Sequence, residues 1–148
     1  YEGIYQAAEG LGDGYQNSKY ISDHPAVLGA LGMLEPLGTT DFKTMRKTMD
    51  KVLKSWNWES TWGWDFPLMA MTALRLHDST LALDLLLYPH VKNSYLGNGH
   101  NYQDKRLRLY LPGNGGLLTT LAWMAQGTMG DKRFGGFPKA WRVHVEGF

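Results

Sequence analysis

Two kinds of helical segment alternate along this chain, and this alternation limits its possible folds more than any other feature. Residues 25–34 are apolar on every side, as expected of a helix that is surrounded by neighbours. Residues 42–56 place apolar side chains at three- and four-residue steps on one face and charged side chains on the other, which predicts an outer helix. Residues 66–76 and 117–125 are again mainly apolar. We therefore expect an all-α fold in which inner and outer helices alternate.

These predicted helices would form part of a toroid, because inner helices in a ring touch neighbours all round while outer helices face water. Residues 66–76 and 79–87, separated by His77 and Asp78, are expected to form a hairpin of helices. Three inner and two outer helices complete only part of a ring, so apolar helix faces would stay uncovered. We expect a missing N-terminal part of the same protein, or another copy of the chain, to cover them.

Two segments depart from the helical pattern. Between Pro89 and Pro112 lies a long polar loop rich in Asn, Gly and Tyr, and residues 141–146 alternate like a short strand. Loops of this length inside a compact domain usually carry function. The first 23 residues are rich in Gly, and no helix is predicted in them after Glu9.

Composition removes several classes of partner. The 148 residues carry a formal net charge of +1, and the longest basic cluster is residues 105–108, so neither nucleic acid nor a membrane surface is an expected partner. The chain has no Cys, which excludes a disulfide framework and a cysteine-ligated zinc site. Its five His show no metal-ligand spacing, so we expect no metal and no cofactor. No apolar run is long enough to span a membrane.

The densest cluster of candidate functional residues lies at the start of a predicted inner helix. Residues 56–67 contain four Trp and two carboxylates, and flat rings beside carboxylates are typical of a sugar-binding cleft. Asp65 and Glu59 are therefore the candidate catalytic residues. The alternatives are that the tryptophans close the end of the ring, that Asp65 caps the helix, and that Glu59 has a capping or surface role.

Three further polar clusters could also contact a sugar. Residues 98–103 supply hydroxyl-binding side chains, although an Asn-Gly turn also explains part of this loop. Residues 113–116 form a predicted glycine turn whose N–H groups suit an anion or a hydroxyl, and Asn114 is equally well explained as a helix cap. Asp23 precedes the first inner helix as a cap or a ligand contact. The predicted sugar-binding residues are Trp58, Trp62, Trp64, Asp23, His24, Asn98, His100, Asn101, Tyr110 and Asn114.

These clusters share one position in the predicted fold. Each of them lies at or before the N-terminal end of an inner helix, so in a toroid they would meet at one mouth. This convergence is the main argument from the residues for a functional site.

Several segments together carry a resemblance to a known group of enzymes. They are SDHPAVLGALGMLEP, WNWESTWGWDFPLMAMTALRL, YLGNGHNYQ and RLYLPGNGGLLTTLAWMAQG, with the ending GFPKAWRVHVEGF. From about Ser22 onward the chain resembles the C-terminal part of bacterial glycoside hydrolases related to families 65 and 95. In the fucosidases of this group, Gly-Trp opens a helix and a Gly-Asn-x-Gly-Gly turn follows later. Gly63-Trp64 and residues 113–116 are similar to these motifs.

The resemblance implies that residues 1–148 are the C-terminal portion of a catalytic (α/α)6 barrel in a periplasmic or secreted glycosidase. Such an enzyme would hydrolyse an oligosaccharide or polysaccharide with inversion, using two carboxyl groups roughly 6.5–9.5 Å apart. In family 95 a catalytic Asp precedes the glycine turn, whereas this chain has Pro112 there. The family's general acid Glu is expected before Tyr1, so activity is expected to need that missing part.

Two rival functions remain open at this point. A disaccharide phosphorylase of the same fold would use residues 113–116 to hold phosphate. A non-catalytic glycan-binding protein is favoured by Pro112 and by the missing acid.

Overall fold

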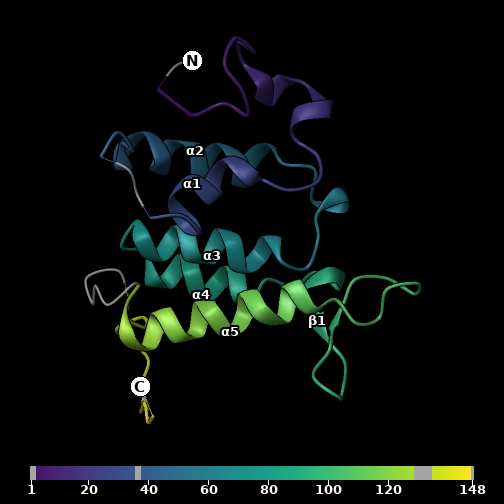
Figure 1. Ribbon diagram of the computed structural model, residues 1–148, viewed down its shortest axis with the longest axis vertical. Coiled ribbons are helices and arrows are strands. Elements are labelled where there is room, and N and C mark those ends of the chain that lie inside the picture. The colour runs from purple at the N-terminus through teal and green to yellow at the C-terminus, as the bar shows by residue number, and fades with distance from the viewer. Residues whose placement is uncertain (1–2, 36–37, 129–134, 148) are drawn as a thin grey trace.

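The structure, a computed structural model, describes residues 3–35, 38–128 and 135–147. Figure 1 shows its helices in layers, with α1 and α2 above α3 and α4, and α5 below them. The α-helices are α1 (Gly29–Gly32), α2 (Phe42–Ser55), α3 (Asp65–Arg75), α4 (Ser79–Leu86) and α5 (Leu111–Gln126). The strands β1 (Ser94–Tyr95) and β2 (Asn101–Tyr102) form one antiparallel pair. Short 3-10 turns cover Gly14–Gln16, Ser18–Tyr20, Ala26–Leu28, Trp58–Ser60 and Val91–Asn93. The chain is thus largely helical, as predicted.

Helix α2 is the amphipathic helix that the sequence predicts. Asp41 caps it, because its carboxylate accepts the N–H of Thr44 at 2.6 Å. Thr39 and Thr40, which also have the side chains of good caps, lie before that position. The buried face of the helix consists of Met45, Thr48, Met49 and Val52.

The hairpin of α3 and α4 forms the centre of the molecule. Every residue of α3 is buried, as expected of an inner helix. Asp78 caps α4, because its carboxylate accepts the N–H of Leu81 at 2.9 Å. Arg75, at the end of α3, donates to the carbonyl oxygens of Leu31 and Leu34, and its guanidinium lies 5.0 Å from the centre of the Trp123 ring. One buried cation therefore connects α3 with α1 and α5.

The first inner helix is shorter than predicted. Residues 25–34 form a 3-10 turn and the four-residue α1, and Met33 and Leu34 are exposed. Gly32 weakens this helix, because glycine is a poor helix former. It also lets α1 pack closely on α3, since a Cβ at Gly32 would lie 2.3 Å from the Thr72 hydroxyl oxygen.

Helix α5 differs from the prediction in two ways. It begins at Leu111, so residues 113–116 lie inside the helix and form no separate turn. Pro112 fits this start, because the first helical turn does not need its missing N–H. The prediction that 117–125 is mainly buried is wrong, since the buried residues of α5 are Gly113, Thr120 and Met124. Leu118 is 66% exposed, so one face of α5 has no described partner.

The two non-helical predictions also need correction. The loop between Pro89 and Pro112 contains a small hairpin in which Ser94 pairs with Tyr102 and Tyr95 with Asn101. Residues 141–146 form no strand and are exposed. An alternating pattern makes a strand only beside another strand, and the described part of the chain offers none there.

Candidate functional site

Asp65 lies at the centre of a polar cluster at the start of α3. Its carboxyl group is fully buried and accepts the N–H of Trp62 at 2.7 Å. Burial raises the pKa of Asp65 to about 6, against the opposing effects of the Trp62 N–H and of His24. Asp65 is the first residue of α3 and not its cap, so the capping alternative is wrong. The carboxyl group therefore has the environment of a proton donor at mildly acidic pH.

His24 links this buried carboxyl to the surface. Its Nδ1 lies 2.8 Å from Oδ1 of Asp65, and its side chain is 36% exposed. Trp64 donates its indole N–H to the same Nδ1 at 2.9 Å. An indole nitrogen can only donate, so Trp64 and Asp65 compete for one ring nitrogen: Nδ1 either accepts the indole N–H or donates its own proton to the Asp65 carboxylate.

Asp23 is the second carboxylate of the cluster, and its backbone adopts an uncommon conformation. Its φ is 58°, in the left-handed region, which Asp tolerates better than most residues. Three contacts hold it there: its N–H donates to Ser60 Oγ at 2.8 Å, its carbonyl accepts the Trp56 indole N–H at 2.9 Å, and its Oδ1 accepts the Trp62 indole N–H at 3.3 Å. Strained residues fixed in this way are often found at functional sites.

Aromatic rings surround these groups. The centre of the His24 ring lies 5.9 Å from that of Trp62 and 5.0 Å from that of Trp64, and the Tyr110 ring lies 5.6 Å from Trp62. Burial and the charge of Asp65 raise the pKa of Tyr110. We call the following six residues the His24 cluster: Asp23, His24, Trp62, Trp64, Asp65 and Tyr110. The structure thus brings six of the predicted site residues together.

The predicted residues of the hairpin have a structural role. Asn101 is fully buried, donates to the carbonyl oxygens of Lys92 and Ser94 at 3.0 and 3.1 Å, and does not reach a surface on which a sugar could bind. Asn114 lies inside α5, so it is not the cap of that helix. Its Oδ1 accepts the N–H of Asn101 and its Nδ2 donates to Gly99, which joins α5 to the hairpin.

Asn101 also explains the two glycine motifs of the sequence. A Cβ at Gly63 would lie 2.0 Å from Oδ1 of Asn101, and a Cβ at Gly113 would lie 2.1 Å from the same atom. That oxygen is buried without an N–H or O–H partner, so the Cα–H groups of the two glycines surround it. The glycines therefore bring the starts of α3 and α5 together around one amide.

Other predicted site residues lie outside the cluster. Glu59 is exposed, and its carbonyl oxygen accepts the Lys92 ammonium at 2.7 Å. Trp58 belongs to a separate aromatic group, stacked 5.6 Å from Tyr88 and 6.1 Å from Phe66. Asn98 and His100 lie in the turn of the hairpin, where the His100 N–H donates to Asn98 Oδ1 at 3.2 Å.

The proposed phosphate cradle at residues 113–116 is not open. These residues are inside α5, and the Gly113 N–H donates to the carbonyl of Tyr110 at 3.1 Å. Gly116 lies against Pro67 of α3, where a Cβ would come within 2.8 Å of the proline ring. Gly113 and Gly116 thus serve helix packing, which was the alternative explanation, whereas Gly115 faces open space.

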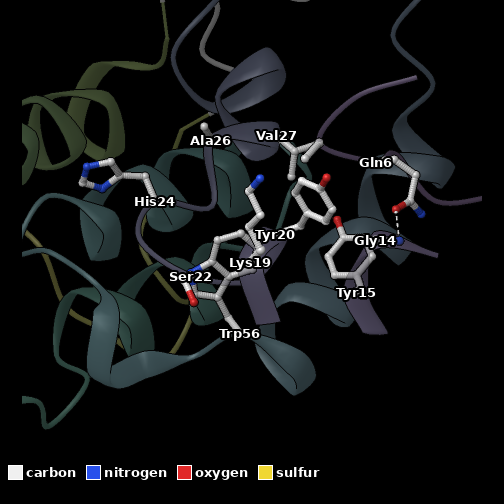
Figure 2. A pocket seen from close by; sticks show the side chains of 11 residues that line it. Gln6, Gly14, Tyr15, Lys19, Tyr20, Ser22, His24, Ala26, Val27 and Trp56 are labelled. Atoms are coloured by element: carbon white, nitrogen blue, oxygen red, sulfur yellow. Dashed lines mark hydrogen bonds between the residues drawn. The ribbon is translucent and has the colours of Figure 1, made fainter. Parts of the chain in front are cut away.

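Two hollows flank the His24 cluster. One of about 230 Å³ lies between the N-terminal segment and Trp56, and His24 forms part of its wall. Figure 2 shows the His24 imidazole turned away from Lys19 and Tyr20, so the ring is directed toward its own cluster. The other, of about 620 Å³, is largely apolar and includes Trp64, Met33 and Leu68 in its lining.

Sequence reasoning missed two groups that hold the site in place. Gln103 accepts the Gly63 N–H through Oε1 at 2.9 Å and is buried, so it fixes the backbone beside Trp62 and Trp64. Ser60 fixes the backbone of Asp23. A polar side chain that fixes a distant backbone leaves no local pattern, so the sequence gives no signal for either role.

No three His, Cys, Asp or Glu residues in the described part of the chain are grouped so as to hold a metal ion. None of its helices is both long and apolar enough to cross a bilayer.

Comparisons with protein-family models, with curated proteins and with solved structures found no match to this chain. Its function must therefore be argued from the chemistry of the site.

Proposed function

We propose that this chain carries the sugar-binding mouth of a glycoside hydrolase that acts on an oligosaccharide or polysaccharide, with inversion. One observation carries the proposal: a buried carboxyl group with a raised pKa, Asp65, contacts the indole-flanked ring of His24 and lies near a second, exposed carboxylate, Asp23. Two carboxyl groups in contrasting environments are what glycoside hydrolysis requires.

The environments of the two carboxyl groups suggest different roles. Asp65 keeps its proton up to about pH 6, which suits the acid that assists departure of the leaving sugar. Asp23 uses Oδ1 to accept from Trp62, and its Oδ2 has no described partner. That oxygen is available to take the proton of an attacking water. The faces of Trp62 and Tyr110 would stack against the sugar ring.

We infer that the helices are part of an (α/α)6 toroid, in keeping with the resemblance to families 65 and 95. The full burial of α3 and the uncovered face of α5 support this arrangement. The proposal assigns no catalytic role to Glu59, because its exposed side chain contacts no member of the His24 cluster.

A non-catalytic glycan-binding protein is the second candidate function. One observation favours it: the indole N–H groups of Trp62 and Trp64 both donate to side chains of the cluster. These hydrogen bonds fix the orientation of the two rings, which suits a surface that binds a sugar without reacting with it. Residues 113–116 lie inside α5 and form no turn that could hold phosphate, so a phosphorylase has no comparable support.

Turnover of natural oligosaccharides and of aryl glycosides by the full-length protein tests this proposal. We expect Asp65→Asn to lower turnover by roughly 10²–10⁴-fold, the usual contribution of a general acid, while it folds normally. Glu59→Gln is the matched control and should retain activity. Binding of a glycan without turnover by the wild type would favour the second candidate, and full activity of Asp65→Asn would contradict the assignment of the acid.

A further inference from the structure

The smaller of the two hollows that flank the His24 cluster, of about 230 Å³, has walls from several parts of the chain. The 3-10 turns Gly14–Gln16 and Ser18–Tyr20 supply part of its lining, and residues 22–27 with Trp56 supply most of the rest. At about 30 Å³ for each water molecule, the space holds about seven waters. This is the scale of one sugar residue. We call this space the Lys19 hollow.

The Lys19 hollow contains one positive charge. Lys19 is the one Lys or Arg among the described residues that line it, and none of these residues is Asp or Glu. Its ammonium lies 5.8 Å from the centre of the Tyr20 ring and forms no ion pair with a described residue. Figure 2 shows the ammonium directed toward Ala26 and Val27, which line the same hollow. The hollow therefore presents a cation to a ligand.

The backbone that carries Lys19 is fixed by local hydrogen bonds. Asn17 begins the turn Ser18–Tyr20, because its side chain accepts the N–H of Lys19 at 3.0 Å. Ser22 donates its hydroxyl to the carbonyl of Ser18 at 2.7 Å, which ties the end of the turn to its start. The ammonium thus extends from a defined position, although the side chain itself is exposed.

Aromatic rings form the other part of the lining. Tyr15 is buried, and its hydroxyl donates to the carbonyl of Tyr5 at 3.0 Å. Trp56 is also buried, and its indole N–H donates to the carbonyl of Asp23 at 2.9 Å. Flat rings held in this way suit the C–H faces of a sugar. The bond from Trp56 also connects the hollow directly to the His24 cluster.

We propose that the Lys19 hollow is a sugar subsite next to the His24 cluster, and that it takes a sugar residue carrying a carboxylate or a sulfate group. This inference rests on the proposed function and deepens it, since it makes the substrate an acidic glycan. His24 lies between the two sites, because it lines the hollow while its imidazole faces the cluster. A glycan bound at the cluster would extend past His24 into the hollow.

Lys19 is the residue that determines the preference for an acidic sugar. A carboxylate or sulfate oxygen would accept a charge-assisted hydrogen bond from the ammonium, which is stronger than a bond between neutral groups. Because Lys19 is exposed, its charge is hydrated in the free protein, and a neutral sugar would not leave it buried without a partner. The cation therefore selects between sugars and does not exclude the neutral ones.

Binding of simple sugars to the full-length protein tests this inference. Glucuronate, glucose 6-sulfate and glucose, with the three galactose counterparts, present one ring with a carboxylate, a sulfate or neither, so they also distinguish the two anions. In NMR titrations we expect wild type to bind at least one acidic sugar about 10-fold or more tightly than its neutral parent. Lys19→Met should remove this preference, and Lys19→Arg should keep it. Lys54→Met changes an exposed lysine at the end of α2 and is the matched control, which should bind like wild type.

Three results would overturn the inference: equal affinity of wild type for acidic and neutral sugars, a preference that survives in Lys19→Met, or no saturable binding of any of the six sugars. These results do not depend on turnover, so hydrolysis of a neutral aryl glycoside would leave the proposed function standing. An acidic preference that depends on Lys19, without turnover of any glycoside by wild type, would instead overturn the hydrolase and leave a site that binds acidic sugars.

Discussion

At the scale of single residues, the cost of burying Asp65 depends on its proton. The pKa of this carboxyl is raised to about 6 in the folded chain, from an ordinary value of 3.8, chiefly because burial disfavours the charged form. Between these two values the folded state holds more protons than the unfolded state. The free energy of unfolding contributed by Asp65 therefore falls as pH rises through this window.

We expect Asp65→Asn to remove this pH dependence. Its amide can still accept the Trp62 N–H and stay within hydrogen-bond distance of His24 Nδ1, and it never becomes charged. Denaturant unfolding at pH 4 and pH 7 should show that the variant gains on the order of 1–3 kcal/mol relative to wild type at the higher pH. A constant difference between the two proteins across this range would show that the carboxyl is not shifted upward.

At the scale of secondary-structure elements, one amide determines how closely α3 and α5 approach the hairpin. Asn101 fixes the carbonyl oxygens of Lys92 and Ser94, and its own oxygen fills the space that a Cβ would need at Gly63 and Gly113. The starts of α3 and α5 are therefore positioned by the missing side chains of Gly63 and Gly113, and neither helix has a side-chain cap.

Alanine substitution separates this role from helix propensity. Gly113→Ala and Gly63→Ala should each destabilise the fold by about 1–3 kcal/mol, because the new methyl group overlaps buried Asn101. Gly115→Ala, on the open side of the same helix, is the matched control and should be neutral or stabilising by up to about 1 kcal/mol. Thermal unfolding of the three variants checks this, and equal effects at all three glycines would contradict the packing argument.

At the scale of the whole molecule, the layers leave apolar surface on the outer side of α5. Leu111, Leu118 and Leu121 are 63%, 66% and 37% exposed on this one helix. Exposed apolar side chains that lie together favour association, because contact removes them from water.

We expect residues 1–148, produced alone, to associate in a concentration-dependent way through this face. Replacing Leu118 and Leu121 by Glu should shift the protein toward monomer in sedimentation velocity. Val145→Glu changes an exposed apolar residue in the C-terminal segment and is the control, which should associate like wild type. A monodisperse wild-type monomer at high concentration would show that the chain covers its own core.

The sequence by itself determined which segments are helical and roughly where α2, α3 and α4 lie, because apolar periodicity acts within a few residues. It also included all six residues of the His24 cluster among its candidates, although only Asp23 with His24, and Trp62 with Trp64 and Asp65, stand close together along the chain. Only the tertiary structure decided the rest. Residues 113–116 continue a helix because α3 and Asn101 pack against their bare backbone, and 141–146 form no strand because no described strand lies beside them. The tertiary structure also decided which carboxyl group is buried and which histidine reaches it. Both depend on contacts between residues about forty positions apart, such as His24 with Asp65. Local sequence patterns contain no information on contacts over such separations.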